Sequence, residues 1–517
     1  MSTIFDEAVL EDRPEIDLSV LRSLSTEPEE IALLAIDIGS SGTRAALFNG
    51  RGEQLEGSMV TVPNASLSSL ISGDDLDPDL LFASVIRAID LAVERAELFV
   101  SRIDYVAMSC FWHSLVGVDE QENAITPLLG WADRRAAQPA VELREQLDES
   151  IWHARTGCRF HPSYWPAKLI WLARARSEAF NRTRHWLSFS DYLYLRLFGN
   201  PTTSVSMASA TGLFDQHNCE WDSELLAKLA VGPHQLPPVA SQQETLQELR
   251  DDYRLRWPIL DRAAWFPAIG DGAANNIGLG SITRDRVALM LGTSGAMRML
   301  SSWAAPQILP PELFCYRADR ERVVIGGALS DGGSAVARVK DELGLKYDAE
   351  ELDQLIDLLE PDAHGLTILP FWSGERAPGW STAAEGAIEG LTAQTQPIEI
   401  VRAVMEAICY RFALIDRVLD LFAPEASIIL TGKIFLSHPV WAQMMADVLG
   451  KQLEVFPAAE ATIRGAALLA LETIGKIEGI ELIKSEAGRV YLPDRNRQEV
   501  YARGLERQER LYHQLIT

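Results

Sequence analysis

The stretch Leu33 to Phe48, LLAIDIGSSGTRAALF, decides which fold this chain can adopt. It predicts an apolar strand that ends in Asp37, a tight turn of small residues from Gly39 to Thr43, and a second strand that starts at Arg44. Short side chains in such a turn let backbone N–H groups converge on an anion, and an acidic residue beside it can hold a hydrated cation. The stretch therefore suits a magnesium nucleotide, although most Gly/Ser-rich hairpins bind nothing.

A second copy of this pattern lies about half a chain length further on, at Val287 to Leu300, VALMLGTSGAMRML. The turn Gly39-Ser40-Ser41-Gly42 aligns with Gly292-Thr293-Ser294-Gly295, and Met290 stands at the position of Asp37. A repeat this long indicates duplicated domains rather than a solenoid, whose periods are about 20–50 residues. Two such hairpins facing each other would hold a nucleotide between them, as in actin-like ATPases. The predicted fold is α/β, with two duplicated actin-like (ribonuclease H-like) domains around a central cleft.

The length of 517 residues and the repeat divide the chain into three predicted parts. Residues 1–30 carry nine acidic and two basic side chains and are expected to be a mobile acidic tail, which serves solubility or docking. Residues 31–260 are the first predicted actin-like domain, and residues 261–517 are the second.

The composition excludes several classes of partner. The formal net charge of −26 repels phosphate backbones and anionic membrane surfaces. The five cysteines form no CxxC pair, which is typical of free thiols in a reducing cytosol. No apolar run is long enough to span a bilayer, and the N-terminal stretch lacks the pattern of a secretory signal. These features predict a cytoplasmic protein that binds neither nucleic acid nor a membrane.

Six motifs, in order along residues 31 to 515, resemble those of the FGGY carbohydrate kinases. They are DIGSSGTR (Asp37 to Arg44), KLIWL (Lys168 to Leu172), LGTSG (Leu291 to Gly295), LPFWSGERAP (Leu369 to Pro378), GAIEGLTAQTQPIEIVRAVMEAI (Gly386 to Ile408) and IRGAALLA (Ile463 to Ala470). The resemblance implies that ATP and Mg²⁺ are used to phosphorylate a sugar hydroxyl, with the sugar bound by the first domain and the nucleotide by the second. Trp165 departs from the family pattern, which prefers a small residue or proline at that position.

The candidate catalytic base is Asp271, in the stretch PAIGDGAANNIGLG. From the residues alone a helix N-cap is the simpler interpretation, because Asp is a favoured N-cap. The resemblance instead implies a base at this Asp-Gly position, which must accept the hydroxyl proton during phosphoryl transfer. The small residues around it would let a sugar hydroxyl approach.

Residues of both hairpins are the candidate nucleotide and metal ligands. Asp37 is expected to hold Mg²⁺ through water, because Mg²⁺ dehydrates reluctantly. Arg44 either approaches the phosphates or forms a structural ion pair. Lys433 replaces the second glycine of a Gly-Gly pair that is usual in the family; it would crowd the nucleotide, contact a phosphate or lean away. The full predicted nucleotide set is Gly39, Ser41, Thr43, Arg44, Thr293, Gly333, Gly432 and Lys433.

The substrate is expected to contact Trp112 and His113 at the end of a strand, and Ser163 and Tyr164 in a later loop. Trp offers an apolar wall to C–H faces, and His can donate to or accept from hydroxyls. Such residues more often belong to a core, so the assignment rests on the resemblance. The charged run Asp133, Arg134 and Arg135 would shape the site or pair internally.

The stretch FWHSLVGVDEQENAITPLLGWADRRA (residues 111–136) is similar to the gluconate kinases of the family. The resemblance thus implies phosphorylation of D-gluconate to 6-phosphogluconate. Positive charge for the gluconate carboxylate would come from His113, His161, Arg135 or Lys168. Trp112 replaces a methionine that is typical there, so xylulose or another pentulose or polyol stays the alternative substrate.

Two further classes of protein share these hairpins. An actin-like ATPase would hydrolyse ATP without a sugar, and a sugar sensor would bind without turnover. Trp112, His113 and Asp271 favour the kinase, since a pure ATPase needs no acceptor wall. The oligomeric state is left open by the sequence, with a homodimer among the alternatives.

Overall fold

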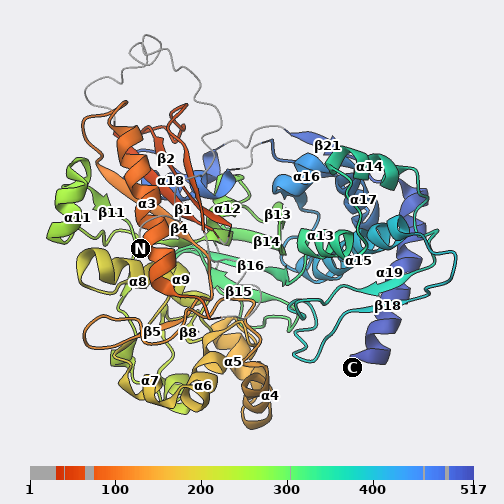
Figure 1. Ribbon diagram of the computed structural model, residues 1–517, viewed down its shortest axis with the longest axis horizontal. Coiled ribbons are helices and arrows are strands. Elements are labelled where there is room, and N and C mark those ends of the chain that lie inside the picture. The colour runs from red at the N-terminus through yellow and green to blue at the C-terminus, as the bar shows by residue number, and fades with distance from the viewer. Residues whose placement is uncertain are drawn as a thin grey trace.

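The computed structural model describes residues 31–39, 41–64, 75–302, 304–457, 460–483 and 488–516. The predicted acidic tail, residues 1–30, lies outside this described part. The described chain forms two lobes, each built on one large mixed sheet, with β14, β15 and β16 near the middle of the molecule (Figure 1).

The first sheet has the strand order β11-β4-β1-β2-β3, and β12 pairs with the far end of β4. Its strands are β1 (Leu33–Ile38), β2 (Gly42–Phe48), β3 (Val60–Pro63), β4 (Tyr105–Cys110), β11 (Ala264–Trp265) and β12 (Ile269–Gly270). β1 runs antiparallel to β2, with Asp37 opposite Arg44, and parallel to β4. The predicted hairpin is therefore confirmed.

The second sheet repeats this arrangement. Its order is β15-β16-β14-β13-β19-β20-β21. The strands are β13 (Arg286–Leu291), β14 (Gly295–Ser302), β15 (Phe314–Arg317), β16 (Arg322–Leu329), β19 (Ser427–Thr431), β20 (Leu453–Val455) and β21 (Arg489–Tyr491). β13 is antiparallel to β14 and parallel to β19, as β1 is to β2 and β4. The shared order and strand directions confirm the predicted duplication.

Helices cover the sheets. In the first half they are α3 (Pro78–Ala96), α4 (Ala137–Gln146), α5 (Glu149–Thr156), α6 (Trp165–Ala175), α7 (Ser177–Arg182), α8 (Phe189–Phe198), α9 (Val205–Ser209), α10 (Ser223–Lys228) and α11 (Asp251–Arg256). In the second half they are α12 (Asp271–Gly278), α13 (Gly333–Glu342), α14 (Ala349–Asp357), α15 (Pro397–Leu419), α16 (Lys433–Ser437), α17 (Pro439–Leu449), α18 (Ala461–Thr473) and α19 (Arg495–Leu515).

Short elements complete the chain. Two-stranded pairs are β5 (Val116–Val118) with β6 (His185–Leu187), β7 (Thr203–Ser204) with β10 (Val239–Ala240), β8 (Phe214–Asp215) with β9 (Glu220–Trp221), and β17 (Thr367–Leu369) with β18 (Ala387–Glu389). Single 3₁₀ turns lie at Pro233–Gln235, Pro258–Leu260 and Ile480–Leu482.

The two halves are joined by a pair of crossing helices. α18, from the C-terminal half, packs against β1, β2 and β4 of the first sheet and against α12 (Figure 1). The helices touch through glycines: a Cβ at Gly278 would lie 1.7 Å from the Ala461 carbonyl oxygen, and one at Gly465 would lie 1.8 Å from that of Ala274. Because α12 begins at Asp271, this crossing fixes the position of that residue.

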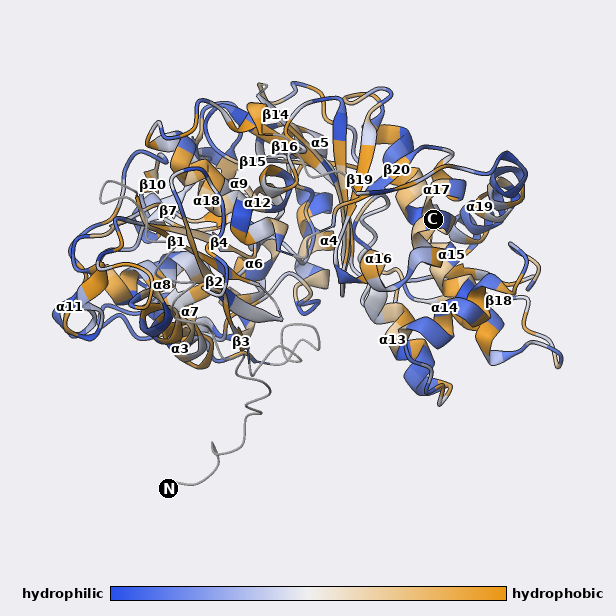
Figure 2. Cartoon of the chain, turned by 90° about the horizontal axis from the view of Figure 1, so that it is seen from above, coloured by the Kyte–Doolittle hydropathy of each residue, from blue (hydrophilic) through white to orange (hydrophobic). Residues whose placement is uncertain are grey.

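The core follows the strand pattern. All six residues of β1 and all eight of β16 are buried, as expected for central strands covered on both faces. Outer helices such as α14 show both hydrophilic and hydrophobic colours in Figure 2. The five cysteines are free and buried. Within the described residues, every helix is too short or too polar to cross a membrane.

Candidate active site

Asp271 stands where β12 meets α12. Gly270 is the N-cap of α12 and Asp271 is its first residue, so Asp271 does not cap the helix with its side chain. Its Oδ1 accepts a hydrogen bond from the backbone N–H of Gly272 at 2.8 Å. The carboxyl is half-buried, and the surrounding protein raises its pKa above the ordinary value of 3.8, chiefly through loss of hydration. A raised pKa makes the ionised carboxylate a stronger base.

Trp112 supports this carboxyl from the first domain. A Cβ at Gly270 would lie 1.9 Å from Trp112 Nε1, and one at Gly272 would lie 2.4 Å from Trp112 Cζ3. The indole thus lies against the backbone on both sides of Asp271, and only glycine leaves room for it. Its Nε1 donates to the Ser206 carbonyl at 3.1 Å. The structure brings these two predicted site residues together.

His113 adds a hydrogen-bond acceptor beside Trp112. Its Nδ1 lies 2.7 Å from the Ala210 carbonyl oxygen, which can only accept, so Nδ1 carries the hydrogen and Nε2 keeps a lone pair. Burial lowers the pKa of His113 to about 3, so the ring is neutral at physiological pH. It is suited to accept from a hydroxyl and carries no charge for a carboxylate.

Tyr164 lies close to His113, with ring centroids 5.2 Å apart. Its hydroxyl is 2.6 Å from that of Tyr316 on β15, a contact between the two halves of the chain. The Tyr316 ring also meets the Trp112 and His113 rings, at centroid distances of 5.1 and 5.5 Å. These four rings form an aromatic wall near Asp271. Tyr316 was missed by the sequence analysis, because it is far from the other three in the chain.

Ser163 is placed differently. Its hydroxyl donates to the Trp131 carbonyl at 2.7 Å, and its backbone N–H donates to His161 Nδ1 at 3.2 Å. Ser163 is 2% exposed, and its hydroxyl and backbone N–H are already used in hydrogen bonds to neighbouring residues of the protein. A substrate contact at Ser163 stays a prediction that this geometry does not favour.

The first hairpin gathers charge around Asp37. Asp37 Oδ1 accepts from the Ser109 hydroxyl at 2.7 Å, and its Oδ2 lies 3.2 Å from Arg44 Nη1. Arg44 Nε also pairs with Glu460, 3.1 Å away, ahead of α18. The pKa of Asp37 is raised to about 6, chiefly by burial and also by the charges of Asp271 and Glu460, while Ser109 and Arg44 oppose the rise. Asp37 and Glu460 contact Arg44, and the charge of Asp271 also acts on Asp37, so negative charge exceeds positive charge here, which fits a cation. The cation would approach Asp37 through water, because both carboxylate oxygens already accept hydrogen bonds.

The remaining residues of this hairpin divide into two kinds. The Gly39 N–H donates to the Gly42 carbonyl at 3.0 Å, which closes the turn, and Ser41 is exposed. Thr43 is fully buried, and its hydroxyl donates to Asn64, whose amide donates to the Gly39 carbonyl. Thr43 therefore supports the turn from behind, and its predicted contact with a nucleotide stays a prediction.

The second hairpin meets two other predicted segments. The Gly333 N–H donates to the Gly292 carbonyl at 2.7 Å, and the Ser334 hydroxyl donates to the Thr293 carbonyl at 2.6 Å. Thr293 itself is exposed. A Cβ at Gly333 would lie 2.1 Å from Ile434 Cδ1, just after Lys433 in α16. The structure thus brings Gly333, Gly432 and Thr293 to one surface.

Lys433 follows directly on Gly432. Gly432 has φ +107°, and a Cβ there would lie 2.2 Å from the Leu291 carbonyl oxygen, so this glycine is required by both conformation and space. Lys433 is the first residue of α16 and is exposed. A contact between Lys433 and the nucleotide stays a prediction.

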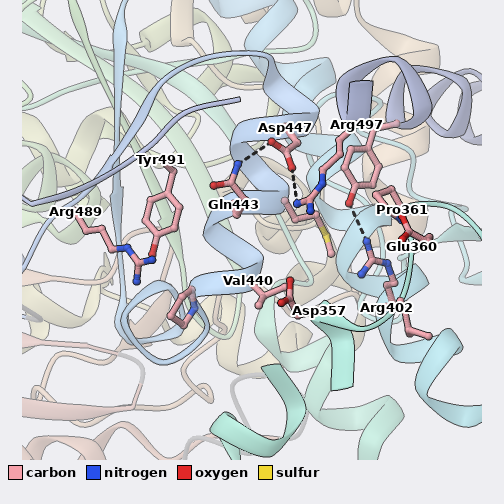
Figure 3. A pocket seen from close by; sticks show the side chains of 14 residues that line it. Asp357, Glu360, Pro361, Arg402, Val440, Gln443, Asp447, Arg489, Tyr491 and Arg497 are labelled. Atoms are coloured by element: carbon pink, nitrogen blue, oxygen red, sulfur yellow. Dashed lines mark hydrogen bonds and ion pairs between the residues drawn. The ribbon is translucent and has the colours of Figure 1, made fainter. Parts of the chain in front are cut away.

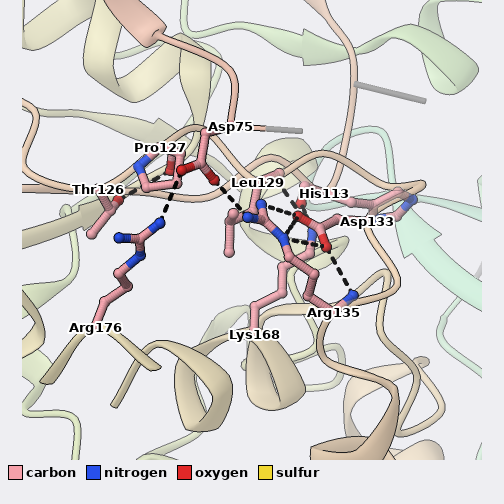
Figure 4. Close-up of polar contacts among 9 residues, drawn as sticks. All are labelled: Asp75, His113, Thr126, Pro127, Leu129, Asp133, Arg135, Lys168 and Arg176. Atoms are coloured by element: carbon pink, nitrogen blue, oxygen red, sulfur yellow. Dashed lines mark hydrogen bonds and ion pairs between the residues drawn. The ribbon is translucent and has the colours of Figure 1, made fainter. Parts of the chain in front are cut away.

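The charged run after the first sheet pairs internally (Figure 4). Arg135 donates hydrogen bonds to both carboxylate oxygens of Asp133, and its Nη1 lies 2.5 Å from Asp75 Oδ1. Arg134 is exposed and donates to the Thr382 carbonyl at 3.4 Å. Lys168 Nζ donates to the His113 carbonyl at 2.6 Å, and burial lowers the pKa of Lys168 to about 7. Lys168 therefore supports the backbone at His113, whereas Arg135 and Asp133 pair with each other.

Two buried arginines near Asp271 were not among the predicted site residues. Arg298 on β14 is 5% exposed, and a Cβ at Gly272 would lie 2.8 Å from its Nη1. Arg376, in the GERAP motif, is 8% exposed and stacks over the Trp131 ring at 4.6 Å. Both positive charges act on the carboxyl of Asp271 and lower its pKa, opposing the effect of burial. The sequence carries a signal for Arg298, since it is the one charged residue of the strand Gly295–Ser302 and follows an apolar run.

A separate pocket of about 290 Å³ lies in the C-terminal half, between α14, α17 and β21 (Figure 3). Its polar groups are mostly paired: Gln443 donates to Asp447 at 2.8 Å, Arg497 contacts Asp447 at 3.6 Å, and Arg402 donates to the Tyr501 hydroxyl at 3.1 Å. None of the predicted site residues lines this pocket.

Known proteins resemble the chain along most of its length. Residues 32–278 match the N-terminal domain of the FGGY family of carbohydrate kinases, and residues 287–473 match its C-terminal domain. A gluconokinase from Bacillus subtilis (strain 168) is 28% identical over 476 residues, which cover 89% of this chain and 91% of that protein. A xylulose kinase from Escherichia coli (strain K12) is 27% identical over 503 residues, covering 93% and 99%.

Solved structures show the same likeness in three dimensions. The crystal structure of a gluconate kinase from Lactobacillus acidophilus has a TM-score of 0.84 and 25% identity, and it covers 94% of this chain and 98% of its own. A ligand-bound xylulose kinase from the same organism has the same values. With both family domains matched in order and the duplicated sheets in place, this chain belongs to the FGGY family of carbohydrate kinases and is a sugar kinase with the two-domain, actin-like fold.

Proposed function

We propose that this kinase phosphorylates the terminal hydroxyl of a sugar acid, with D-gluconate converted to 6-phosphogluconate as the specific reaction. The single observation that carries the proposal is the packing of Trp112 on both sides of Asp271, beside the neutral acceptor His113. This arrangement places a candidate base, Asp271, beside an aromatic surface against which a polyhydroxylated substrate would pack. The gluconokinase relatives along 89% of the chain support the choice of acceptor.

The chemistry asked of the protein is positioning and charge compensation. Asp271 would accept the proton of the terminal hydroxyl as that oxygen attacks the γ-phosphate of ATP, and its raised pKa makes it a better base. Trp112 packs against the backbone on both sides of Asp271, and His113 Nε2 would accept a hydrogen bond from a neighbouring hydroxyl. The aromatic wall keeps water from the reacting oxygens.

Mg²⁺ fits the first hairpin by charge. The charges of Asp271 and Glu460 act on Asp37, and Arg44 pairs with Asp37 and Glu460. When bound, Mg²⁺ would neutralise charge on the β- and γ-phosphates. The exposed Ser41 and Thr293, with the turn glycines Gly39, Gly333 and Gly432, are the groups we assign to the nucleotide.

Xylulose is the second candidate acceptor. The Escherichia coli xylulose kinase covers more of this chain than the gluconokinase relatives do, at nearly equal identity. A neutral ketose would also suit the uncharged His113. The two candidate substrates differ in charge, because gluconate carries a carboxylate and xylulose does not.

A coupled assay of ADP release over an acceptor panel tests the proposal. The panel contains D-gluconate, D-xylulose, D-ribulose and glycerol, each against a blank without acceptor. We expect D-gluconate to give the highest kcat/KM, and nuclear magnetic resonance of the product to show phosphate on the C6 oxygen. ADP release that is independent of every acceptor would instead identify an ATPase, and release with D-xylulose alone would establish the second candidate.

A further inference from the structure

Arg298 lies beside the base with few partners for its donors. Its Nε donates to Asn276 Oδ1 at 3.3 Å, a long bond, and its Nη2 is buried without a hydrogen-bond partner. A guanidinium has five N–H groups and cannot lose its charge in practice. Among the described residues, Arg298 forms no ion pair within 4 Å, although it is 5% exposed.

A second guanidinium increases the local positive charge. Arg376 donates through Nη2 to the Leu329 carbonyl at 2.6 Å, but its Nε is buried and unpartnered. Burial, together with the charge of Arg376 and against that of Asp271, lowers the pKa of Arg298 to about 10. The charge of Asp271 acts on both guanidiniums, and that of Asp331 acts on Arg376, but among the described residues neither arginine forms an ion pair within 4 Å. Their unpartnered N–H groups leave room for a second anion, that of a bound substrate.

The four residues that the sequence offers for a substrate carboxylate are paired, uncharged or bonded to backbone carbonyls. Arg135 is held by Asp133 and Asp75. Burial lowers the pKa of His113 to about 3, that of His161 well below its ordinary value, and that of Lys168 to about 7. Lys168 keeps part of its charge near pH 7, but its Nζ already donates to the carbonyls of His113 and Leu129. These four residues, which the sequence offers as sources of positive charge, are therefore poorly placed to meet a carboxylate.

The position of Arg298 fits the acceptor better than the nucleotide. Arg298 is three residues beyond Gly295, so its Cα lies about 10 Å along β14 from the phosphate-type turn. Its guanidinium reaches back towards Gly272, next to the base. An aldonate that gives its terminal hydroxyl to Asp271 and its carboxylate to Arg298 would therefore bind in a bent conformation against Trp112 and Tyr316.

We propose that Arg298 is the specificity-determining residue that binds the carboxylate of an aldonate substrate, with Arg376 as the neighbouring charge that favours the anion. The inference rests on the proposed function, because it names the group that distinguishes a sugar acid from a neutral sugar. A carboxylate would accept a forked pair of hydrogen bonds from Arg298, which a hydroxymethyl group in the same place cannot do.

The test compares D-gluconate with D-glucitol, which has the same carbon chain with a hydroxymethyl group in place of the carboxylate. Wild type, Arg298→Gln and Arg298→Lys are assayed with both acceptors. Arg417→Gln, an exposed arginine of α15 paired with Glu509, is the matched control for loss of one positive charge. Nucleotide binding and thermal unfolding are measured for each variant.

We expect wild type to prefer D-gluconate and Arg298→Gln to lower the gluconate-to-glucitol ratio of kcat/KM by about 10- to 100-fold, the range of a hydrogen bond to a charged group. Arg298→Lys should fall between them, because it keeps the charge but loses the fork. The control should keep the wild-type ratio. An unchanged ratio in Arg298→Gln, or equal losses with both acceptors, would overturn the inference.

Two outcomes separate this inference from the proposed function. If wild type phosphorylates D-gluconate and the Arg298→Gln ratio stays unchanged, only the role of Arg298 is wrong. If wild type phosphorylates neutral acceptors and no aldonate, both are wrong. Should Arg298→Gln fail to fold, equilibrium binding of D-gluconate and D-glucitol to wild type decides, and equal affinities contradict the carboxylate site.

Discussion

Asp271 is half-buried, and its ionised form is less favourable there than in water. Its raised pKa means that the folded state holds the proton more tightly than the unfolded state, so ionisation above that pKa lowers stability. Asp271→Asn should therefore keep or raise the unfolding temperature at pH 7. It should also lower kcat by about 10²- to 10⁴-fold, the usual contribution of a general base. Nearly normal turnover in this variant would show that another group takes the proton.

The pH profile offers a second test at the residue scale. The base must be ionised, so kcat/KM should fall as pH drops through the pKa of Asp271, above the ordinary value of 3.8. His113 is neutral at physiological pH, since its pKa is lowered to about 3. His113→Gln should thus weaken acceptor binding and leave the acidic limb in place. Loss of that limb in His113→Gln would assign the titration to the imidazole instead.

At the scale of elements, the crossing of α12 and α18 sets the position of the base. Gly465→Ala would place a methyl group 1.8 Å from the Ala274 carbonyl oxygen, which requires the helices to move apart. We expect a loss of about 1–3 kcal/mol in the free energy of unfolding and a lower kcat, because α12 carries Asp271. Urea titration and steady-state kinetics measure the two effects.

Gly50→Ala is the control for this substitution. A Cβ at Gly50 has no neighbour within 4 Å, so its variant should match wild type in stability and rate. If Gly465→Ala behaved like Gly50→Ala, the helix crossing would be looser than described and would not fix the base.

At the scale of the whole molecule, the two halves meet at the acceptor through Tyr164 and Tyr316. Removing either hydroxyl breaks the 2.6 Å contact and leaves the other one without its partner. Tyr164→Phe and Tyr316→Phe should each lower kcat/KM by about 2- to 10-fold, and the double variant should be no worse than one of them. Fully additive losses would mean that the two hydroxyls act independently.

The sequence predicted the architecture because its signals are local and repeated. The hairpin at Leu33 to Phe48 and its copy at Val287 to Leu300 each show their turn and strands in consecutive residues, and the structure confirms both. The buried aromatic pair at Trp112 and His113 could be placed by family resemblance. That their contacts lie around Asp271 is a finding of the structure.

What the sequence could not predict depends on contacts between distant segments. Arg298 and Tyr316 reach the site from strands of the second sheet, so no spacing along the chain links them to Trp112. The burial that neutralises His113 and the pairing of Arg135 with Asp75 likewise arise only when the chain folds. The expected change of domain at residue 260 stays a prediction; β12, at Ile269–Gly270, still pairs in the first sheet.

The measurement that tests the central claim most directly is the initial rate of ADP release with and without D-gluconate, for wild type and Asp271→Asn. We predict a rate that depends on D-gluconate in wild type and falls by about 10²- to 10⁴-fold in Asp271→Asn, with unchanged affinity for ATP. ADP release that needs no acceptor, or that survives the loss of Asp271, would contradict the assignment of this chain as a sugar-acid kinase with Asp271 as its base.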